Sequence, residues 1–483
     1  MRRRSTLAAV VIVAVVLISG LAVHHVVKRH NRSSATDRSR PNVLLICIDT
    51  LRPDHLTCYG YERRTSPNLD KLAAEGVLFE SHISSTSWTL PAHAALFTSL
   101  PDSVHGCTDT DKRLDDSFVT LAEAFAAAGY STAGFFSGPY LHPAFGLSQG
   151  FAHYEDCTSF AGLIDDVPVA QWAEHNGVMQ LSHHDVTNPI VYAAFRKWLA
   201  KNRDSNFFTF LHLWDPHFDY APPPPYDTMF DPDYTGSISG VNYLFDQRIN
   251  ADMPARDLQH LIALYDGEIA WTDHYLGLIL RDLEKAGLLD NTIVAITSDH
   301  GEEFFEHGSK THRETLFDEV IRVPLVIRYP AKLPAGSRVR AQTRSIDVAP
   351  TLLELVGLPA MENVMGASLL DLATGKETVS DNVAISELFS LGRRMRTIRS
   401  PEWKLTDHLN LNRRYFINLV DDPGERNCLT DLAQEPGNVL LTRYQAVSAE
   451  LIAHRSRWAT HADRSTIPDD VLKQLMSLGY LGQ

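Results

Sequence analysis

Short, uninterrupted apolar segments recur along this chain and constrain its fold more than any other feature. They lie at Asn42–Ile48, Thr132–Phe136, Phe207–Leu213, Thr292–Thr297 and Val323–Ile327. Helical stretches separate them: Ser117–Ala128 precedes a glycine, and apolar residues recur at helical spacing from Leu258 to Ala286. A strand without polar alternation is buried on both faces, as in a parallel sheet covered by helices. The pattern therefore predicts an α/β fold with a largely parallel central sheet.

The pattern changes at about residue 380. Three shorter strand-like segments and a helix near Asn438–Trp458 follow; the segments are Met395–Ile398, Trp403–Leu405 and Tyr415–Asn418. Such a mixture is typical of a smaller α+β subdomain. We therefore expect a main domain over residues 41–380 and a C-terminal subdomain over residues 381–483.

Residues 1–40 differ from the rest of the chain in charge and hydropathy. They hold eight basic residues against one acidic residue, whereas the whole chain has a net charge of −15. Leu7–Val23 is apolar and uncharged, close to the ~20 residues of a membrane-spanning helix. We interpret this segment as a membrane anchor with a basic linker, which holds the main domain outside the cytoplasm; a cleaved signal peptide is the alternative. The acidic remainder argues against a nucleic-acid partner.

Residues with metal-binding side chains follow three of the apolar segments at the point where each ends. Asp49 follows the first, Asp215 and His217 follow Phe207–Leu213, and Asp299 and His300 follow Thr292–Thr297. In an open α/β sheet, ligands bind at the carboxyl ends of the strands. Carboxylates and imidazoles gathered there suit a divalent cation, although any single strand-end Asp has helix capping as its alternative role.

Thr89 stands at the predicted start of a helix, which Pro91 favours. Free backbone N–H groups and the positive end of the helix dipole attract an anion to such a position. A hydroxyl group beside a cation there has the chemistry to attack a sulfate or phosphate ester. A purely structural role as helix N-cap is the alternative.

Several motifs occur in a fixed order: PNVLLICIDTLRPDHLTCYGY, SWTLPAHAALFTSLPDSVHG, FLHLWDPHFDYAPPPPY, ITSDHGEEFFEHG and SIDVAPTLLELVGLP. In these motifs, from Pro41 nearly to its C-terminus, the chain resembles the sulfatases of the alkaline-phosphatase superfamily. The resemblance implies an alkaline-phosphatase-like α/β/α sandwich whose main domain is catalytic. It also implies one divalent cation, Ca²⁺ by family precedent, and a covalent intermediate on a nucleophile at a helix start.

The resemblance assigns the cation ligands residue by residue. Asp49 and Asp299 match metal-binding aspartates, whereas Thr50 replaces a further Asp of many sulfatases and His300 stands where they usually carry Asn. Thr89 matches the Cys or Ser that becomes formylglycine, which a threonine cannot form. The implied ligands are therefore Asp49, Thr89, Asp299 and His300, and this set makes Mn²⁺, Mg²⁺ or Zn²⁺ plausible besides Ca²⁺.

The resemblance also assigns catalytic side chains. His93 stands at the arginine of the family's Cys-x-Pro-x-Arg motif, and His217 matches an active-site histidine. A later active-site lysine of the family falls closest to His312, with Lys310 in reserve. The family's Gly-Lys-x-His stretch is absent, because the chain reads Gly-Phe-Phe-Ser-Gly from residue 134. A second ion held by His217, His312 and Asp215 is conceivable, but we expect one.

The resulting hypothesis is a metal-dependent hydrolase that cleaves sulfate or phosphate esters through a covalent intermediate on Thr89. Its substrate is a small-molecule, glycan or lipid ester. A phosphodiesterase, a phosphonate monoester hydrolase or a membrane-anchored phospho-group transferase is an alternative, because the threonine and the absent lysine depart from typical sulfatases. A catalytically degenerate binding protein is a further alternative, which the retained Asp49, Asp299 and His300 disfavour.

Overall fold

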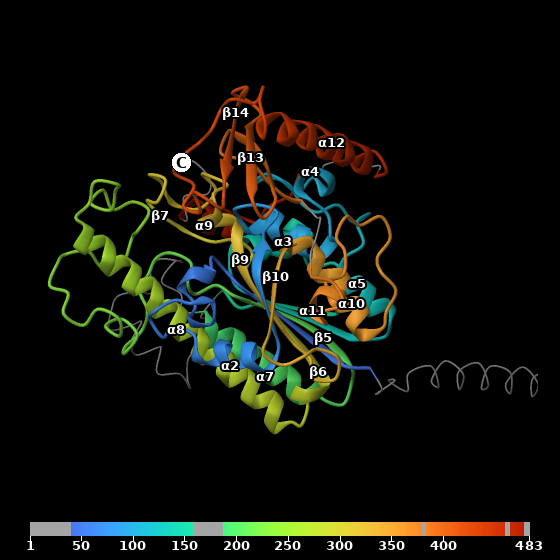
Figure 1. Ribbon diagram of the computed structural model, residues 1–483. Helices are drawn as coiled ribbons and strands as arrows, with labels where there is room; N and C mark the ends of the chain where they lie inside the picture. The colour runs from blue at the N-terminus through green and yellow to red at the C-terminus, as the bar shows by residue number, and fades with distance from the viewer. Residues whose placement is uncertain (1–39, 159–186, 379–382, 459–463, 478–483) are drawn as a thin grey trace, which may run out of the picture. The chain divides into compact units, whose positions relative to one another are not determined.

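The structure, a computed structural model, describes residues 40–158, 187–378, 383–458 and 464–477. The described residues from Arg40 onward belong to one compact unit. An eight-stranded sheet runs through it in the order β10-β2-β9-β6-β1-β5-β3-β4 (Figure 1). The strands are β1 Asn42–Ile48, β2 Val77–Ile83, β3 Ser131–Phe136, β4 His153–Asp156, β5 Phe207–Leu213, β6 Thr292–Thr297, β9 Arg322–Arg328 and β10 Ser337–Arg344. All are parallel except β9, which is antiparallel to its neighbours β2 and β6.

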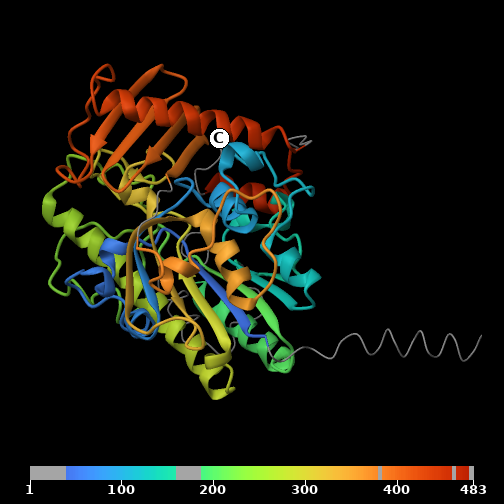
Figure 2. The same ribbon diagram turned by 45° about the vertical axis from the view of Figure 1, so that its right-hand side comes forward.

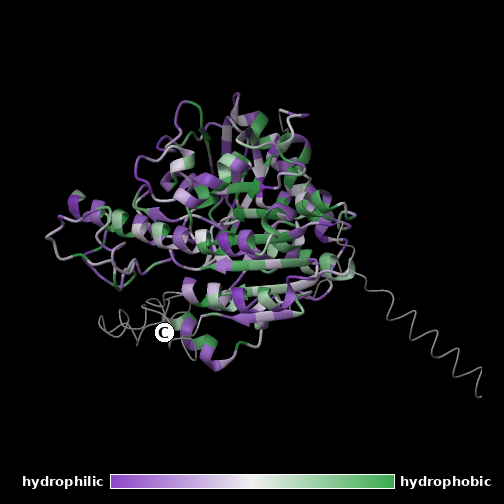
Figure 3. Ribbon diagram, turned by 90° about the horizontal axis from the view of Figure 1, so that it is seen from below, coloured by the Kyte–Doolittle hydropathy of each residue, from purple (hydrophilic) through white to green (hydrophobic). Residues whose placement is uncertain are grey.

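Helices cover both faces of this sheet (Figure 1). The first face carries α2 Pro67–Glu75, α7 Asn188–Asn202 and α8 Ala255–Lys285, and the second carries α3 Thr89–Thr98, α5 Leu121–Ala127 and α10 Val348–Val356. Alternate residues of β1 serve the two layers: Leu44 and Ile46 pack with the first, and Val43 and Leu45 with the second. Figure 3 shows the hydrophobic residues concentrated in the strands between these layers. The predicted α/β/α sandwich with a largely parallel sheet is confirmed.

The predicted strands Asn42–Ile48, Phe207–Leu213 and Thr292–Thr297 coincide with β1, β5 and β6. Val323–Ile327 lies in β9, the one antiparallel strand of the central sheet, so its apolar pattern did indicate a buried strand but not its direction. Three strands of this sheet were not predicted, β2, β4 and β10, because their sequences, VLFESHI, HYED and SRVRAQTR, contain polar residues and lack a continuous apolar run.

The C-terminal part of the chain forms a four-stranded antiparallel sheet with one long helix (Figure 2). The sheet consists of β11 Ala384–Ser390, β12 Arg393–Arg399, β13 Trp403–His408 and β14 Arg413–Asn418, and the helix is α12 Gly437–Arg455. Leu440 and Tyr444 of α12 pack on this sheet. The predicted α+β subdomain is thus present, with β11 as a strand that the sequence did not predict. Strand β11 joins the main domain, where Glu387 N donates to Ser85 O at 2.7 Å.

No helix in the described part of the chain is both long enough and apolar enough to cross a membrane. The predicted anchor at Leu7–Val23 lies outside the described residues. The anchor therefore stays a prediction.

Candidate active site

Two adjacent strands bring the predicted cation ligands together at the carboxyl edge of the central sheet. Asp49 directly follows β1, and Asp299 and His300 follow its neighbour β6. His300 Nε2 lies 3.6 Å from Asp49 Oδ1 and 3.4 Å from Asp299 Oδ2. All three side chains are buried. The pairing of the strands thus places residues that are 250 positions apart in sequence within reach of one ion.

The predicted nucleophile faces this group. Helix α3 begins at Thr89, and Trp88 occupies the N-cap position, so the alternative of Thr89 as N-cap is wrong. Thr89 Oγ1 lies 3.3 Å from His300 Nε2. The guanidinium of Arg313 lies over the Trp88 ring, 4.5 Å from its centroid, and stabilises the loop that leads into the helix. The hydroxyl group therefore lies at the first turn of α3, beside the imidazole of His300.

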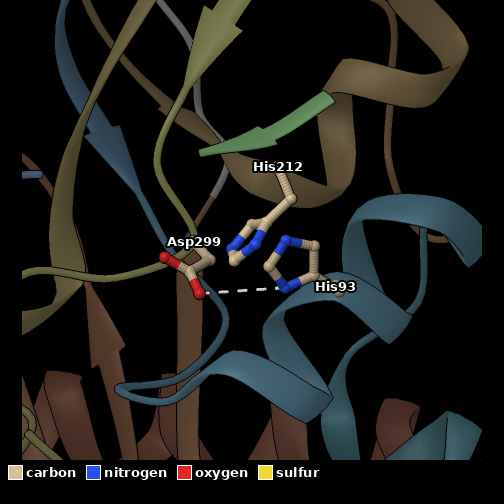
Figure 4. Close-up of side chains that lie close together, drawn as sticks. All are labelled: His93, His212 and Asp299. Carbon is tan, nitrogen blue, oxygen red and sulfur yellow. Dashed lines mark ion pairs between the residues drawn. The ribbon is translucent and has the colours of Figure 1, made fainter. Parts of the chain in front are cut away.

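Two further histidines extend the group on the side of α3 (Figure 4). His93 is four residues after Thr89, one helical turn on, and its Nδ1 lies 3.7 Å from Asp299 Oδ2. His212, on β5, has its ring centroid 5.0 Å from that of His93 and its Nε2 3.4 Å from Asp49 Oδ2. The sequence analysis placed His93 at the site but missed His212, which stands inside the apolar run FFTFLHL. Its signal was the strand period of two, which puts His212 on the α3 face beside Phe210.

The electrostatics of the group fit a divalent cation. Burial raises the pKa of Asp49 to about 7, and burial together with the Asp49 charge raises the pKa of Asp299. Burial lowers the pKa of both His93 and His212 to about 4, so both imidazoles are neutral at pH 7. Within the described residues, Asp49 Oδ1, Asp299 Oδ2 and the Nε2 atoms of both histidines have no hydrogen-bond partner. Two carboxylates and neutral imidazoles that face one another unpaired are the donors that such an ion requires.

A second layer of imidazoles lies beside His300. The His312 ring centroid is 4.4 Å from that of His300 and 5.0 Å from that of His217. His312 Nδ1 lies 3.2 Å from Oε1 of the buried Glu302. Burial raises the pKa of Glu302 well above its usual range, and the sequence analysis did not single this residue out. His312 thus lies against the ligand group and His217 lies against His312, so the two imidazoles form one cluster beside the proposed ligands.

Lys310, the reserve candidate for the family's later lysine, is engaged elsewhere. Its Nζ donates to the carbonyl oxygens of Tyr243 at 2.8 Å and Ile249 at 3.0 Å. Lys310 therefore holds the long connection between β5 and α8, and the geometry favours His312 for the active-site position.

Asp215 does not join the histidines, although it follows an apolar strand just as Asp299 does. Its carboxylate accepts hydrogen bonds from Thr187 N at 2.9 Å, Asn188 N at 3.3 Å and Trp271 Nε1 at 3.0 Å. These bonds secure the start of α7 on α8. Asp215 thus caps a helix, but one that precedes β5 in the chain and not the following helix. The second ion site conceived from His217, His312 and Asp215 is accordingly not assembled.

The sequence model of the sulfatase family matches residues 41–358. The chain belongs to the sulfatase family. A second family model, described as the C-terminal part of N-sulphoglucosamine sulphohydrolase, matches residues 306–443 and so includes the four-stranded sheet. Family membership makes this sulfatase-family protein a hydrolase of ester bonds.

Individual relatives agree with this assignment. The N-acetylglucosamine-6-O-sulfatase of Bacteroides thetaiotaomicron is 25% identical over 403 residues, which cover 69% of this chain and 71% of the relative. The ulvan-active sulfatase of Formosa agariphila is 27% identical over 365 residues, which cover 72% of this chain and 68% of the relative.

Solved structures share the fold. A protein in complex with its substrate D-glucosamine-2-N,6-O-disulfate gives a TM-score of 0.71 at 20% identity, covering 86% of this chain and 98% of that chain. The phosphonate monoester hydrolase of Agrobacterium radiobacter gives a TM-score of 0.70 at 24% identity, and the match covers 86% of this chain and 96% of that chain.

Proposed function

We propose that this protein hydrolyses sulfate esters with Thr89 as its nucleophile and with a divalent cation held by Asp49, Asp299 and His300. The observation that carries the proposal is the position of Thr89 Oγ1, at the first residue of α3 and 3.3 Å from His300 Nε2. The N-terminal N–H groups and dipole of α3 favour the bound sulfate at the same place.

The reaction divides into two transfers of a sulfo group. In the first, Oγ1 of Thr89 attacks sulfur, the bond from sulfur to the ester oxygen breaks, and the alcohol leaves with a proton. In the second, water attacks the sulfur of the threonine ester, and Oγ1 regains a proton as sulfate departs. The cation, when bound, lowers the pKa of the threonine hydroxyl group. His217 and His312 take the proton from the Thr89 hydroxyl group and give it to the leaving alcohol; in the second transfer they take a proton from the water and return it to Oγ1. Glu302 orients His312.

A basic groove supports a substrate that carries further negative charges. The groove encloses about 480 Å³ between β12, α12 and the segment after α4 Asp102–His105. Its lining contains five basic residues and one acidic residue: Lys112, Arg393, Arg394, Arg396, Arg455 and Asp109. Ser390 lines the groove and accepts hydrogen bonds from Arg313, whose guanidinium lies over Trp88, the residue before the nucleophile. We therefore infer a sugar sulfate with additional anionic groups, consistent with the glucosamine sulfates that relatives act on or bind.

The proposal is tested with p-nitrophenyl sulfate, phosphate, phosphodiester and phosphonate esters, each in the presence of Mn²⁺, Mg²⁺, Zn²⁺ or Ca²⁺. We expect the sulfate to be turned over fastest, and Thr89→Val to lose about 10³-fold or more in kcat. Thr98→Val is the matched control, because Thr98 lies at the other end of α3 and its hydroxyl group donates to Ala94 O within the same helix. Unchanged turnover in Thr89→Val would contradict the assignment of Thr89 as the nucleophile. Faster turnover of a phosphorus ester than of the sulfate would contradict the assignment of a sulfate ester as the substrate.

A further inference from the structure

The buried donors at the sheet edge form two overlapping groups instead of one. Asp49, Asp299 and His300 make the first group, and His93, His212 and Asp299 make the second. Within each group the candidate ligand atoms lie within 4.8 Å of one another. The cation of the proposed function accounts for the first group. It leaves His93 and His212 without a role.

Both of these histidines present a lone pair. His93 Nδ1 lies 2.8 Å from Thr89 O, and His212 Nδ1 lies 2.5 Å from Ser137 O. Because a carbonyl oxygen only accepts, each Nδ1 carries the ring proton and each Nε2 is left as an acceptor. Both rings are fully buried, and neither Nε2 has a hydrogen-bond partner among the described residues. An imidazole fixed by an outer hydrogen bond, with its other nitrogen free, has the arrangement of a metal ligand.

The carboxylates are arranged to serve two sites. Asp49 directs one oxygen to each group, since Oδ1 lies 3.6 Å from His300 Nε2 and Oδ2 lies 3.4 Å from His212 Nε2. Asp299 Oδ2 lies 3.4 Å from His300 Nε2 and 3.7 Å from His93 Nδ1, the nitrogen that carries the ring proton. Asp49 therefore has the position of a bridging ligand, and Asp299 lies beside the histidines of both groups.

We propose that His93, His212 and Asp299 form a second cation site, adjacent to the first and sharing its carboxylates, and that this site takes Zn²⁺. Two imidazoles and a carboxylate are a typical zinc donor set, and Asp49 is within reach as a fourth ligand. The first group, with one imidazole and two carboxylates, is richer in oxygen. The apolar wall of the second group, which includes Phe97 and Phe210 against the His93 ring, keeps it closed to substrate. The inferred role of this second ion is therefore to neutralise and position the carboxylates of the first site.

Metal counting tests this site without any substrate, so the outcome does not depend on which ester the enzyme cleaves. The full-length protein is stripped with a chelator and dialysed against Zn²⁺, and bound zinc is measured by plasma mass spectrometry. We expect two ions per chain in the wild type and one in His212→Gln and in His93→Gln. His82→Gln is the matched control, because His82 is equally buried but lies on β2, outside both groups, and it should keep two ions.

A second readout covers the case in which a substituted histidine disturbs folding. In the wild-type protein loaded with Co²⁺, we expect two titration steps in the visible absorption, each saturating at one equivalent. A single ion per chain in the wild type, by either measurement, overturns the proposal. Two ions in a folded His212→Gln variant overturn it as well.

Discussion

Two regions of this protein bury charged side chains, and they do so in opposite ways. At the carboxyl edge of the central sheet, Asp49 and Asp299 lie close together, and oxygens of both lack hydrogen-bond partners within the described residues. Where the C-terminal sheet meets the main domain, Lys404 Nζ lies 2.8 Å from Glu425 Oε1 and 3.0 Å from Asp318 Oδ1. Paired opposite charges stabilise the fold, whereas two neighbouring carboxylates without cationic partners form a binding site for a cation.

The junction shows what full pairing does. Arg399 Nη2 lies 2.7 Å from Asp318 Oδ2, so two cations face the Asp318 carboxylate. Despite its burial, Arg399 and Lys404 hold the pKa of Asp318 well below its usual range. At the sheet edge the pKa of Asp49 instead rises to about 7, because burial outweighs the imidazole of His300. The same residue type is thus stabilised in its charged form in one region and destabilised in the other.

The largest effect is expected from Asp299→Asn, which alters the residue common to both donor groups. We expect sulfate ester hydrolysis to fall by about 10³-fold or more, because the cation loses a charged ligand. We also expect the chelated protein to be at least as stable as the wild type, since one of two neighbouring buried carboxylates is neutralised. Turnover measurements check the expected loss of hydrolysis, and urea unfolding checks the expected stability. Loss of stability in the chelated variant would show that Asp299 is a structural residue.

Breaking the paired region has a different expected signature. Lys404→Met leaves Asp318 and Glu425 partly unpaired, and we expect the free energy of unfolding to fall by about 3–5 kcal/mol. The matched control is Lys376→Met, because the Lys376–Asp371 pair, 2.9 Å apart, is exposed and screened by solvent, and its loss should leave the free energy of unfolding almost unchanged. Equal effects of the two substitutions would contradict the contrast between the regions. Urea unfolding monitored by circular dichroism provides the measurement.

The smallest effect concerns a buried group that belongs to neither region. Burial lowers the pKa of His82 from 6.5 to about 3. The unfolded chain therefore binds a proton at this residue below pH 6.5, whereas the folded protein does not until about pH 3. His82 thus destabilises the fold progressively as the pH falls from 6.5 to 3, by about 1.4 kcal/mol per pH unit. In His82→Gln, the slope of the free energy of unfolding against pH should be smaller by the equivalent of one proton. An unchanged slope between pH 6.5 and 5 would refute this assignment.

The sequence predicted the parts of the fold and site that depend on local pattern. Continuous apolar runs predicted β1, β5 and β6. The polar residues that follow β1 and β6 predicted the candidate cation ligands Asp49, Asp299 and His300. Strands β2 and β10 were missed because their sequences mix polar and apolar residues. His212 was missed for the opposite reason, since one imidazole inside a hydrophobic strand reads as part of the core.

Asp215 and Asp299 mark the boundary between what sequence and structure decide. Both follow a buried strand, so the sequence by itself determined that each would stand at the carboxyl edge of the sheet. Only the tertiary structure decided that Asp215 secures α7 through Thr187 and Trp271, while Asp299 faces His93 and His300. The physical reason is that strand formation depends on neighbours in sequence, whereas the hydrogen-bond and charge partners of a buried carboxylate come from distant segments brought together by packing.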